Sequence, residues 1–136
     1  MRTLFTLTCL TLAGNGFSQT QPDLSGKWQS KSDGNLRWVL AQTPDQIHVQ
    51  EYSGSSLKAD YVCNELGKEC EIKDSGHSEK TSFWFNGPKL VELRVHGGNV
   101  VKRRYDLLDD GKTLEVELLP ISPPGKTEKL EFARAQ

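Results

Sequence analysis

The sequence predicts an all-β fold, an antiparallel up-and-down meander of roughly 8–10 strands closed into a small barrel. Two observations support this prediction: turn signals that recur about every 10–13 residues, and intervals that alternate between apolar and polar residues. The turn signals lie at 33–35, 43–45, 53–56, 66–67, 74–76, 86–88, 97–99, 109–111 and 122–125. No interval between them is long enough for a well-formed helix, and no linker divides the chain.

The intervals alternate as strands with one dry and one wet face do. Apolar residues recur at every second position in sets that each share a face: Leu24, Gly26 and Trp28; Leu36, Trp38 and Leu40; Leu114, Val116 and Leu118; Leu130 and Phe132, continued by Arg134. In 91–96 the same reasoning assigns Val91, Leu93 and Val95 to the dry face and Glu92, Arg94 and His96 to the wet face. A sheet of this kind leaves two aggregation-prone edges unless it closes, so closure into a barrel is expected.

The first 18 residues have the features of a secretory signal peptide. A basic start at Arg2 precedes an uncharged apolar run over 4–13, and small residues follow up to Ser18. The run is too short to span a bilayer, and Cys9 lies inside it, in a poor context for lipidation. Cleavage after Ser18 would leave residues 19–136 as a single barrel domain, exported to the periplasm or secreted. The alternative is a buried N-terminal strand or helix.

Charge and composition argue against nucleic acid as a partner. The formal net charge is −1 at pH 7, and the signal segment holds one basic residue, Arg2. The strongest basic run is Lys102-Arg103-Arg104, and its members alternate faces in a strand. The sequence therefore predicts no nucleic-acid partner and no transmembrane span, and it leaves the oligomeric state open.

Two cysteines remain after the signal segment, Cys63 and Cys70. An even pair in an exported chain predicts a disulfide. With a loop at 65–68, the two cysteines would face each other across a hairpin ladder in which Asn64 pairs with Glu69. The chain-entropy model gives a loop of this length about 2.5 kcal/mol of stabilisation. Two thiols alone make a poor zinc site, because no histidine lies close in sequence.

An N-terminal Gly26-Lys27-Trp28, a meander of this length and Arg134 in the last strand resemble the calycin group of barrels, which comprises lipocalins, fatty-acid-binding proteins and avidins. The closest likeness is to small exported bacterial lipocalin-like proteins that begin with Ser-Gly-Lys-Trp. The resemblance implies that Trp28 lies across one end of the barrel and that Arg134 packs over it, with Gly26 as the third part of this plug. Any binding site would then lie towards the opposite end.

The chain also departs from those families. Its opening looks like that of avidins, but Ser30 and Gly34 stand where polar biotin-binding residues are expected, so biotin is not predicted. The Thr-Asp-Tyr signature of lipocalins is absent, and Ala59-Asp60-Tyr61 is the nearest match.

Arg103 and Tyr105 are separated by one residue and therefore point to the same side of a strand. The pair resembles the Arg-x-Tyr pair with which fatty-acid-binding barrels hold a carboxylate, because guanidinium and phenol can both donate to one carboxylate. In those proteins the pair lies on the final strand, whereas two strands are expected to follow here. The alternative is an ordinary strand position with a snorkelling arginine or a cross-strand ion pair.

Four aromatic residues are candidates for the lining of an apolar pocket: Trp38, Tyr61, Phe83 and Phe85. The competing interpretation is a filled core, because the interior of a small barrel can be closed by its own side chains.

Metal binding and catalysis have little support. His48, His77 and His96 are scattered, and His48 and His96 are expected to face water. The sequence has no Gly-x-Ser-x-Gly elbow and no His-Glu-x-x-His, and its acidic pairs Asp109-Asp110 and Glu115/Glu117 are expected to be solvated.

The sequence thus favours an exported, non-enzymatic lipocalin-like barrel that binds a small apolar or amphipathic ligand, with no cofactor and no metal. The alternative is a barrel with a filled core that acts as an envelope or protein-interaction module without a small ligand. An enzyme built on the same scaffold is a third hypothesis.

Overall fold

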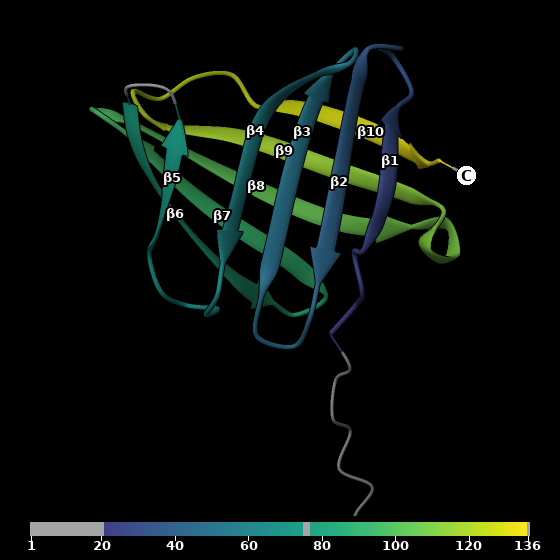
Figure 1. Cartoon of the computed structure of the whole chain (residues 1–136), viewed down its shortest axis with the longest axis horizontal. Coiled ribbons are helices and arrows are strands. Elements are labelled where there is room, and N and C mark those ends of the chain that lie inside the picture. Colours follow the sequence, from purple (N-terminus) through teal and green to yellow (C-terminus); the bar gives the residue numbers. More distant parts are fainter. Residues whose placement is uncertain (1–20, 75–76, 136) are drawn as a thin grey trace, which may run out of the picture.

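The computed structural model describes residues 21–74 and 77–135. Ten antiparallel strands follow one another along the described part of the chain, and consecutive strands pair with each other except β4 and β5 (Figure 1). Their bounds are β1 Gly26–Ser30, β2 Leu36–Gln42, β3 Ile47–Ser53, β4 Ser56–Cys63, β5 Cys70–Asp74, β6 His77–Asn86, β7 Lys89–His96, β8 Asn99–Leu108, β9 Thr113–Ser122 and β10 Glu128–Arg134. A short 3-10 turn over Asp109–Gly111 joins β8 to β9. The predicted meander is confirmed.

The ten strands form one sheet in the order β4-β3-β2-β1-β10-β9-β8-β7-β6-β5. The first strand pairs with the last, so that the two ends of the meander join, with Trp28 opposite Arg134. In Figure 1 the strands β1–β4 cross in front of β7–β10 at a steep angle, as the two walls of a flattened barrel do. The barrel is not fully closed, because β4 and β5 are the two edges of the sheet and do not pair with each other.

Cys63 and Cys70 form a disulfide between these edges, with Cα atoms 5.5 Å apart. The predicted disulfide is confirmed, but the predicted ladder around it, with Asn64 opposite Glu69, is wrong. The strands β4 and β5 are not hydrogen-bonded neighbours. Instead the loop between them reaches β6, where the Gly67 N–H donates to the Phe83 carbonyl oxygen at 2.7 Å. A covalent link and this bond hold the seam where the ladder is missing.

One end of the barrel, the closed end, is covered by the segment that precedes β1. Leu24 and Trp28 are both buried, and the Trp28 indole Nε1–H donates to the Leu24 carbonyl oxygen at 3.0 Å. Gln42 holds this segment in place, because its Oε1 accepts from the Leu24 N–H at 3.0 Å and its Nε2 donates to the Pro22 carbonyl oxygen at 2.9 Å.

The guanidinium of Arg134 lies over the Trp28 ring, 4.3 Å from its centroid, so the contact expected between the two ends of the chain is present. Arg134 also donates to the Ser25 carbonyl oxygen at 2.8 Å and to the Gly111 carbonyl oxygen at 3.1 Å. Gly26 has φ +151°, and a Cβ at this position would press on the Arg134 guanidinium. Glycine is therefore needed here for two reasons: it adopts a backbone conformation that other residues rarely adopt, and it leaves space for the Arg134 side chain.

Candidate functional site

The inner face of β7 is polar beyond Leu90, which is a buried core residue. Glu92 is completely buried inside the barrel, and Arg94 and His96 follow it on the same face. The prediction that this face of the strand is wet is therefore wrong for Glu92 and Arg94, whereas His96 keeps 43% of its side chain exposed. On the opposite face Val91 is buried as expected, but Leu93 and Val95, also predicted to be dry, are only half-buried. A strand that alternates perfectly fits either orientation, and its neighbours in the barrel decide which face turns inward.

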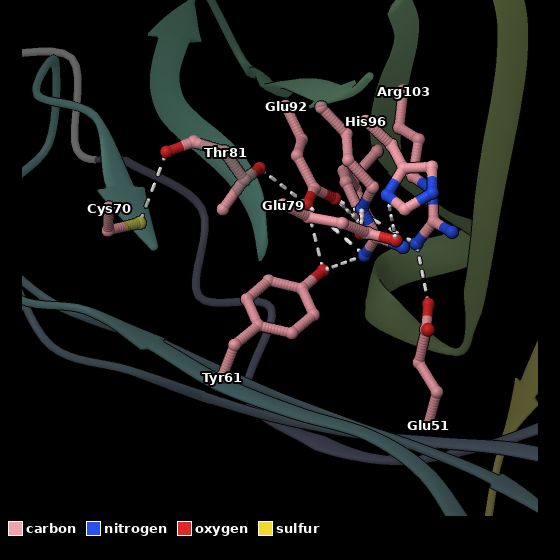
Figure 2. Close-up of polar contacts among 10 residues, drawn as sticks. Glu51, Tyr61, Cys70, Glu79, Thr81, Glu92, His96 and Arg103 are labelled. Carbon is pink, nitrogen blue, oxygen red and sulfur yellow. Dashed lines mark hydrogen bonds and ion pairs between the residues drawn. The ribbon is translucent and has the colours of Figure 1, made fainter. Parts of the chain in front are cut away.

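Glu92 is the centre of a hydrogen-bonded cluster (Figure 2). Its Oε2 accepts from the Tyr61 hydroxyl and from Thr81 Oγ1, both at 2.8 Å, and its Oε1 accepts from the Tyr105 hydroxyl at 2.5 Å. The donors come from β4, β6 and β8, so the carboxylate joins strands on different sides of the barrel. A buried carboxylate needs partners of this kind, because an unpaired charge inside a protein is strongly unfavourable.

Two guanidinium groups supply the opposite charge. Arg94 Nη2 lies 3.5 Å and Arg103 Nη1 lies 3.8 Å from the nearer Glu92 oxygen. Arg103 Nη1 also reaches across the interior to Glu51 Oε1 on β3, at 2.5 Å, and Arg94 Nη2 donates to the Tyr61 hydroxyl at 2.6 Å. The contacts continue towards the other end of the barrel, where Glu79 lies within 3.9 Å of Arg94. We call the whole set the polar layer: Glu51, Tyr61, Glu79, Thr81, Glu92, Arg94, His96, Arg103 and Tyr105.

These contacts set the ionisation of the layer. Burial by itself raises the pKa of Glu92, but Arg103 and Arg94, with the hydroxyls of Tyr105 and Tyr61, outweigh it, so the pKa lies below its ordinary value. For both tyrosines, burial and then the nearby Glu92 charge raise the pKa well above the ordinary value. Glu92 is therefore ionised at neutral pH, and both phenols keep the protons that they donate to it.

Exposure within the polar layer increases away from the closed end. The exposed fraction of the side chain is 0% for Glu92, 13% for Arg103, 22% for Glu79 and 43% for His96. Strand direction places His96 beside the turn at 97–98, at the end of the barrel opposite Trp28. We call this the exposed end. The polar layer therefore leads from solvent at the exposed end to a buried carboxylate in the middle of the barrel.

The sequence-predicted ligand residues lie mostly in and beside this layer. Trp38 packs on Phe132 with ring centroids 4.6 Å apart, and the Arg103 guanidinium lies 5.1 Å from the Trp38 centroid. Tyr61 stacks on Phe83 at 6.2 Å, and Phe85 follows Phe83 on the same face of β6. Tyr105 is fully buried. Trp38, Tyr61, Phe83, Arg103 and Tyr105 thus come together in the interior, and Phe85, further towards the closed end, is half-buried at the margin of the core.

Sequence reasoning missed the polar residues that these predicted residues contact. The sequence does not single out Glu51, Thr81, Glu92 and Arg94 as site residues, although Glu51 and Glu92 contact Arg103 or Tyr105, and Thr81 and Arg94 contact Glu92. No single strand carries a signal for them. The pairing of β7 with β8 would have indicated Glu92, because it places Glu92 directly opposite Arg103.

Of the histidines, only His48 and His96 have described side chains, and each contacts a different carboxylate. His48 Nε2 lies 2.6 Å from Asp60 Oδ1, and His96 Nδ1 lies 3.2 Å from Glu79 Oε1 in the polar layer. The side chain of His77 lies outside the described residues. Among the described residues, no group of three or more histidine, cysteine or acidic side chains is placed to hold a metal ion.

Several solved structures have a similar fold. A secretory abundant heat soluble protein from Ramazzottius varieornatus has a TM-score of 0.68 and 15% identity, covering 86% of this chain and 98% of its own. The REP1-NXSQ fatty acid transporter has a TM-score of 0.67 and 13% identity, with 83% and 96% covered. A Schistosoma mansoni fatty acid binding protein in complex with arachidonic acid has a TM-score of 0.62 and 16% identity, with 83% and 96% covered.

Family models and curated proteins give no match to this sequence. No helix within residues 21–74 and 77–135 is long and apolar enough to cross a membrane. At identities of this level the structural likeness concerns the fold. The protein has the calycin-like β-barrel fold that its sequence predicts.

Proposed function

We propose that this protein is an exported, non-enzymatic calycin-like barrel, with residues 19–136 as its single domain, that takes up a small amphipathic molecule through the exposed end. The observation that carries the proposal is the partial exposure of inward-facing apolar side chains around the polar layer. These residues are Leu36, Ala59, Leu118 and Leu130. Apolar side chains next to fixed polar groups are the usual composition of a small-molecule site.

Inward orientation follows from the alternation of each strand. Leu118 shares its face of β9 with the buried Val116, and Leu130 shares its face of β10 with the buried Phe132. Both leucines nevertheless remain half-buried, because they lie nearer the exposed end. An apolar tail against these residues would remove apolar surface from water, which is the main driving force for binding such a molecule.

The structural neighbours agree with this proposal, since two of the three are named for fatty acids. Export is supported by the Cys63–Cys70 disulfide, because disulfides persist mainly in oxidising compartments. The predicted signal peptide, residues 1–18, lies outside the described residues.

The His96–Glu79 contact at the exposed end is the type of pair that general-base catalysis uses. Glu79 also faces Arg94 at 3.9 Å, which makes the pair part of a continuous charge network. We therefore assign these two side chains to the wall of the binding site rather than to a reaction.

A second candidate function, an envelope or protein-interaction module with a filled interior, is favoured by the contacts between the two walls. Arg103 on β8 reaches Glu51 on β3, and Trp38 on β2 packs on Phe132 on β10. These contacts close the barrel at the level of Arg103, so a ligand would have to lie between the Arg103–Glu51 contact and the exposed end.

Native mass spectrometry of the exported protein separates the two candidates. Ligand binding predicts a retained lipid-sized mass that is lost on denaturation and absent from Leu118→Trp, where an indole would fill the inner side of β9. The matched control is Leu119→Trp, which places the same indole on the outer face of the same strand. Repeated preparations without such a mass, together with unchanged tryptophan fluorescence on adding lipids, would favour the filled-core module.

A further inference from the structure

The donors expected to hold a ligand carboxylate are already engaged by a carboxylate of the protein itself. The Tyr105 hydroxyl donates to Glu92 Oε1 at 2.5 Å, and Arg103 Nη1 lies 3.8 Å from the same oxygen. Glu92 therefore occupies the position between guanidinium and phenol that an incoming carboxylate would need. It is completely buried and fixed to the middle of β7, so it cannot leave this position as a bound molecule can.

The remaining positive charge of the layer is engaged as well. Arg103 contacts both Glu51 and Glu92, and Arg94 contacts both Glu92 and Glu79. Among the described side chains, the layer thus combines the carboxylates of Glu51, Glu79 and Glu92 with two guanidinium groups, so carboxylates outnumber guanidiniums. A further anion would bring repulsion without gaining an unengaged cation.

We propose that Glu92 acts as a resident counter-anion that excludes carboxylates, so that the barrel accepts amphiphiles with a neutral or cationic headgroup. This inference rests on the proposed ligand-binding function and adds the class of ligand to it. The headgroup lies against Glu79, Glu51 and the exposed edge of Arg94, and the tail lies along the half-buried apolar side chains nearer the exposed end. Hydroxyl and amine headgroups can donate to these carboxylates, whereas a carboxylate headgroup cannot.

The test is a headgroup series of equal chain length on the intact exported protein. Dodecylamine, dodecanol and dodecanoate are titrated below their micelle concentrations at neutral pH, with binding followed by calorimetry and by Trp38-dependent fluorescence. The native protein is expected to bind the amine and the alcohol about tenfold or more tighter than the carboxylate. Dodecanoate binding as tight as dodecanol would overturn the inference while leaving the proposed function intact. Absence of binding by all three would contradict both.

A substitution of Glu92 tests its role directly. Glu92→Gln keeps the shape and most hydrogen bonds but leaves Arg103 and Tyr105 without the charge that they hold. Its affinity for dodecanoate is expected to rise about tenfold while that for dodecanol stays within about twofold. The matched control, Glu115→Gln, removes the same charge from the outer face of β9 and is expected to change neither affinity. An equal gain for dodecanoate in both variants would show that only net charge matters and would contradict a resident counter-anion. If Glu92→Gln does not fold, the series on the native protein still decides the question.

Discussion

Trp28 at the closed end and Glu92 in the polar layer are equally buried, but different interactions hold the two regions together. At the closed end Trp28 is surrounded by apolar residues such as Leu24, and its one polar atom, Nε1, is satisfied by a backbone carbonyl. In the polar layer Glu92 is just as inaccessible, but three hydroxyls and two guanidiniums surround it. Removal of apolar surface from water stabilises the first region, and matched charge makes the second one tolerable.

This difference separates stability from specificity within one barrel. Hydrophobic contacts are non-directional, so the closed end provides stability without selecting a ligand. A charged layer is costly unless every member is paired, and in the function that we propose the same pairing selects the headgroup. Each of the following predictions tests this separation.

The largest expected effect comes from Trp28→Ala. Truncating a fully buried indole leaves a cavity, and we expect a loss of about 3–5 kcal/mol in the free energy of unfolding, measured by urea titration. Trp84→Ala, on the outer face of β6 and only half-buried, is the control and should cost less than half as much. If the two losses were equal, Trp28 would not have the special place that we assign to the closed end.

Removing the disulfide tests the seam between β4 and β5. We expect the double variant Cys63→Ala/Cys70→Ala to lose about 2.5 kcal/mol in the free energy of unfolding. Without the link between β4 and β5, the unfolded chain gains conformational freedom. Ligand affinity should change little, since the polar layer is held by other contacts. The comparison is made by thermal unfolding, with reduced native protein as the second reference. A loss of ligand binding that matched the loss of stability would contradict the separation.

Glu92→Gln should lower stability by about 2 kcal/mol at neutral pH, the usual value for hydrogen bonds to a charged group. The pKa of Glu92 is below its ordinary value of 4.5 in the folded protein, so its stabilising contribution is complete above pH 4.5 and disappears as the pH falls through the folded value. Urea unfolding across this range should therefore show a shallower acid loss in Glu92→Gln than in native protein. Parallel curves would mean that Glu92 does not carry the charge of the layer.

The smallest effect is expected for Arg134→Ala. The cation–π contact with Trp28 lies at a partly solvated site, and its loss with the two hydrogen bonds should cost about 1 kcal/mol. Arg104→Ala is the control, because its ion pair with Glu117, at 3.4 Å on the outer face, should contribute close to nothing. Equal losses in thermal unfolding would indicate that the arginine over Trp28 is an ordinary surface residue.

Most of the fold followed from the sequence because it rests on local signals. Turn residues such as Asn86-Gly87 and Gly97-Gly98 separate the strands, and the expected number of up to ten is confirmed. The contact between Trp28 and Arg134, which joins the two ends of the chain, was implied by the resemblance to calycin barrels rather than by local signals.

The candidate site followed only in part. Arg103 and Tyr105 were chosen for the right chemistry, guanidinium and phenol on either side of a carboxylate, but the carboxylate that the structure places there is Glu92. In 91–96, apolar residues alternate with polar ones, so reasoning from this strand alone assigned the polar face, with Glu92, to solvent. The seam between β4 and β5 was missed for a similar reason, since the residues of a short loop do not determine whether the two flanking strands pair.

By itself, the sequence determined that the chain forms a meander of short strands, linked near its middle by Cys63 and Cys70 and closed at one end by Trp28. Turn chemistry and alternation act over a few residues, so they can be recognised without knowing the rest of the molecule. Tertiary structure alone decided which face of β7 turns inward, because that choice depends on Tyr61, Thr81 and Arg103 arriving from other strands to satisfy Glu92. A buried charge is acceptable only when its partners are present, and closure of the barrel is what brings them together.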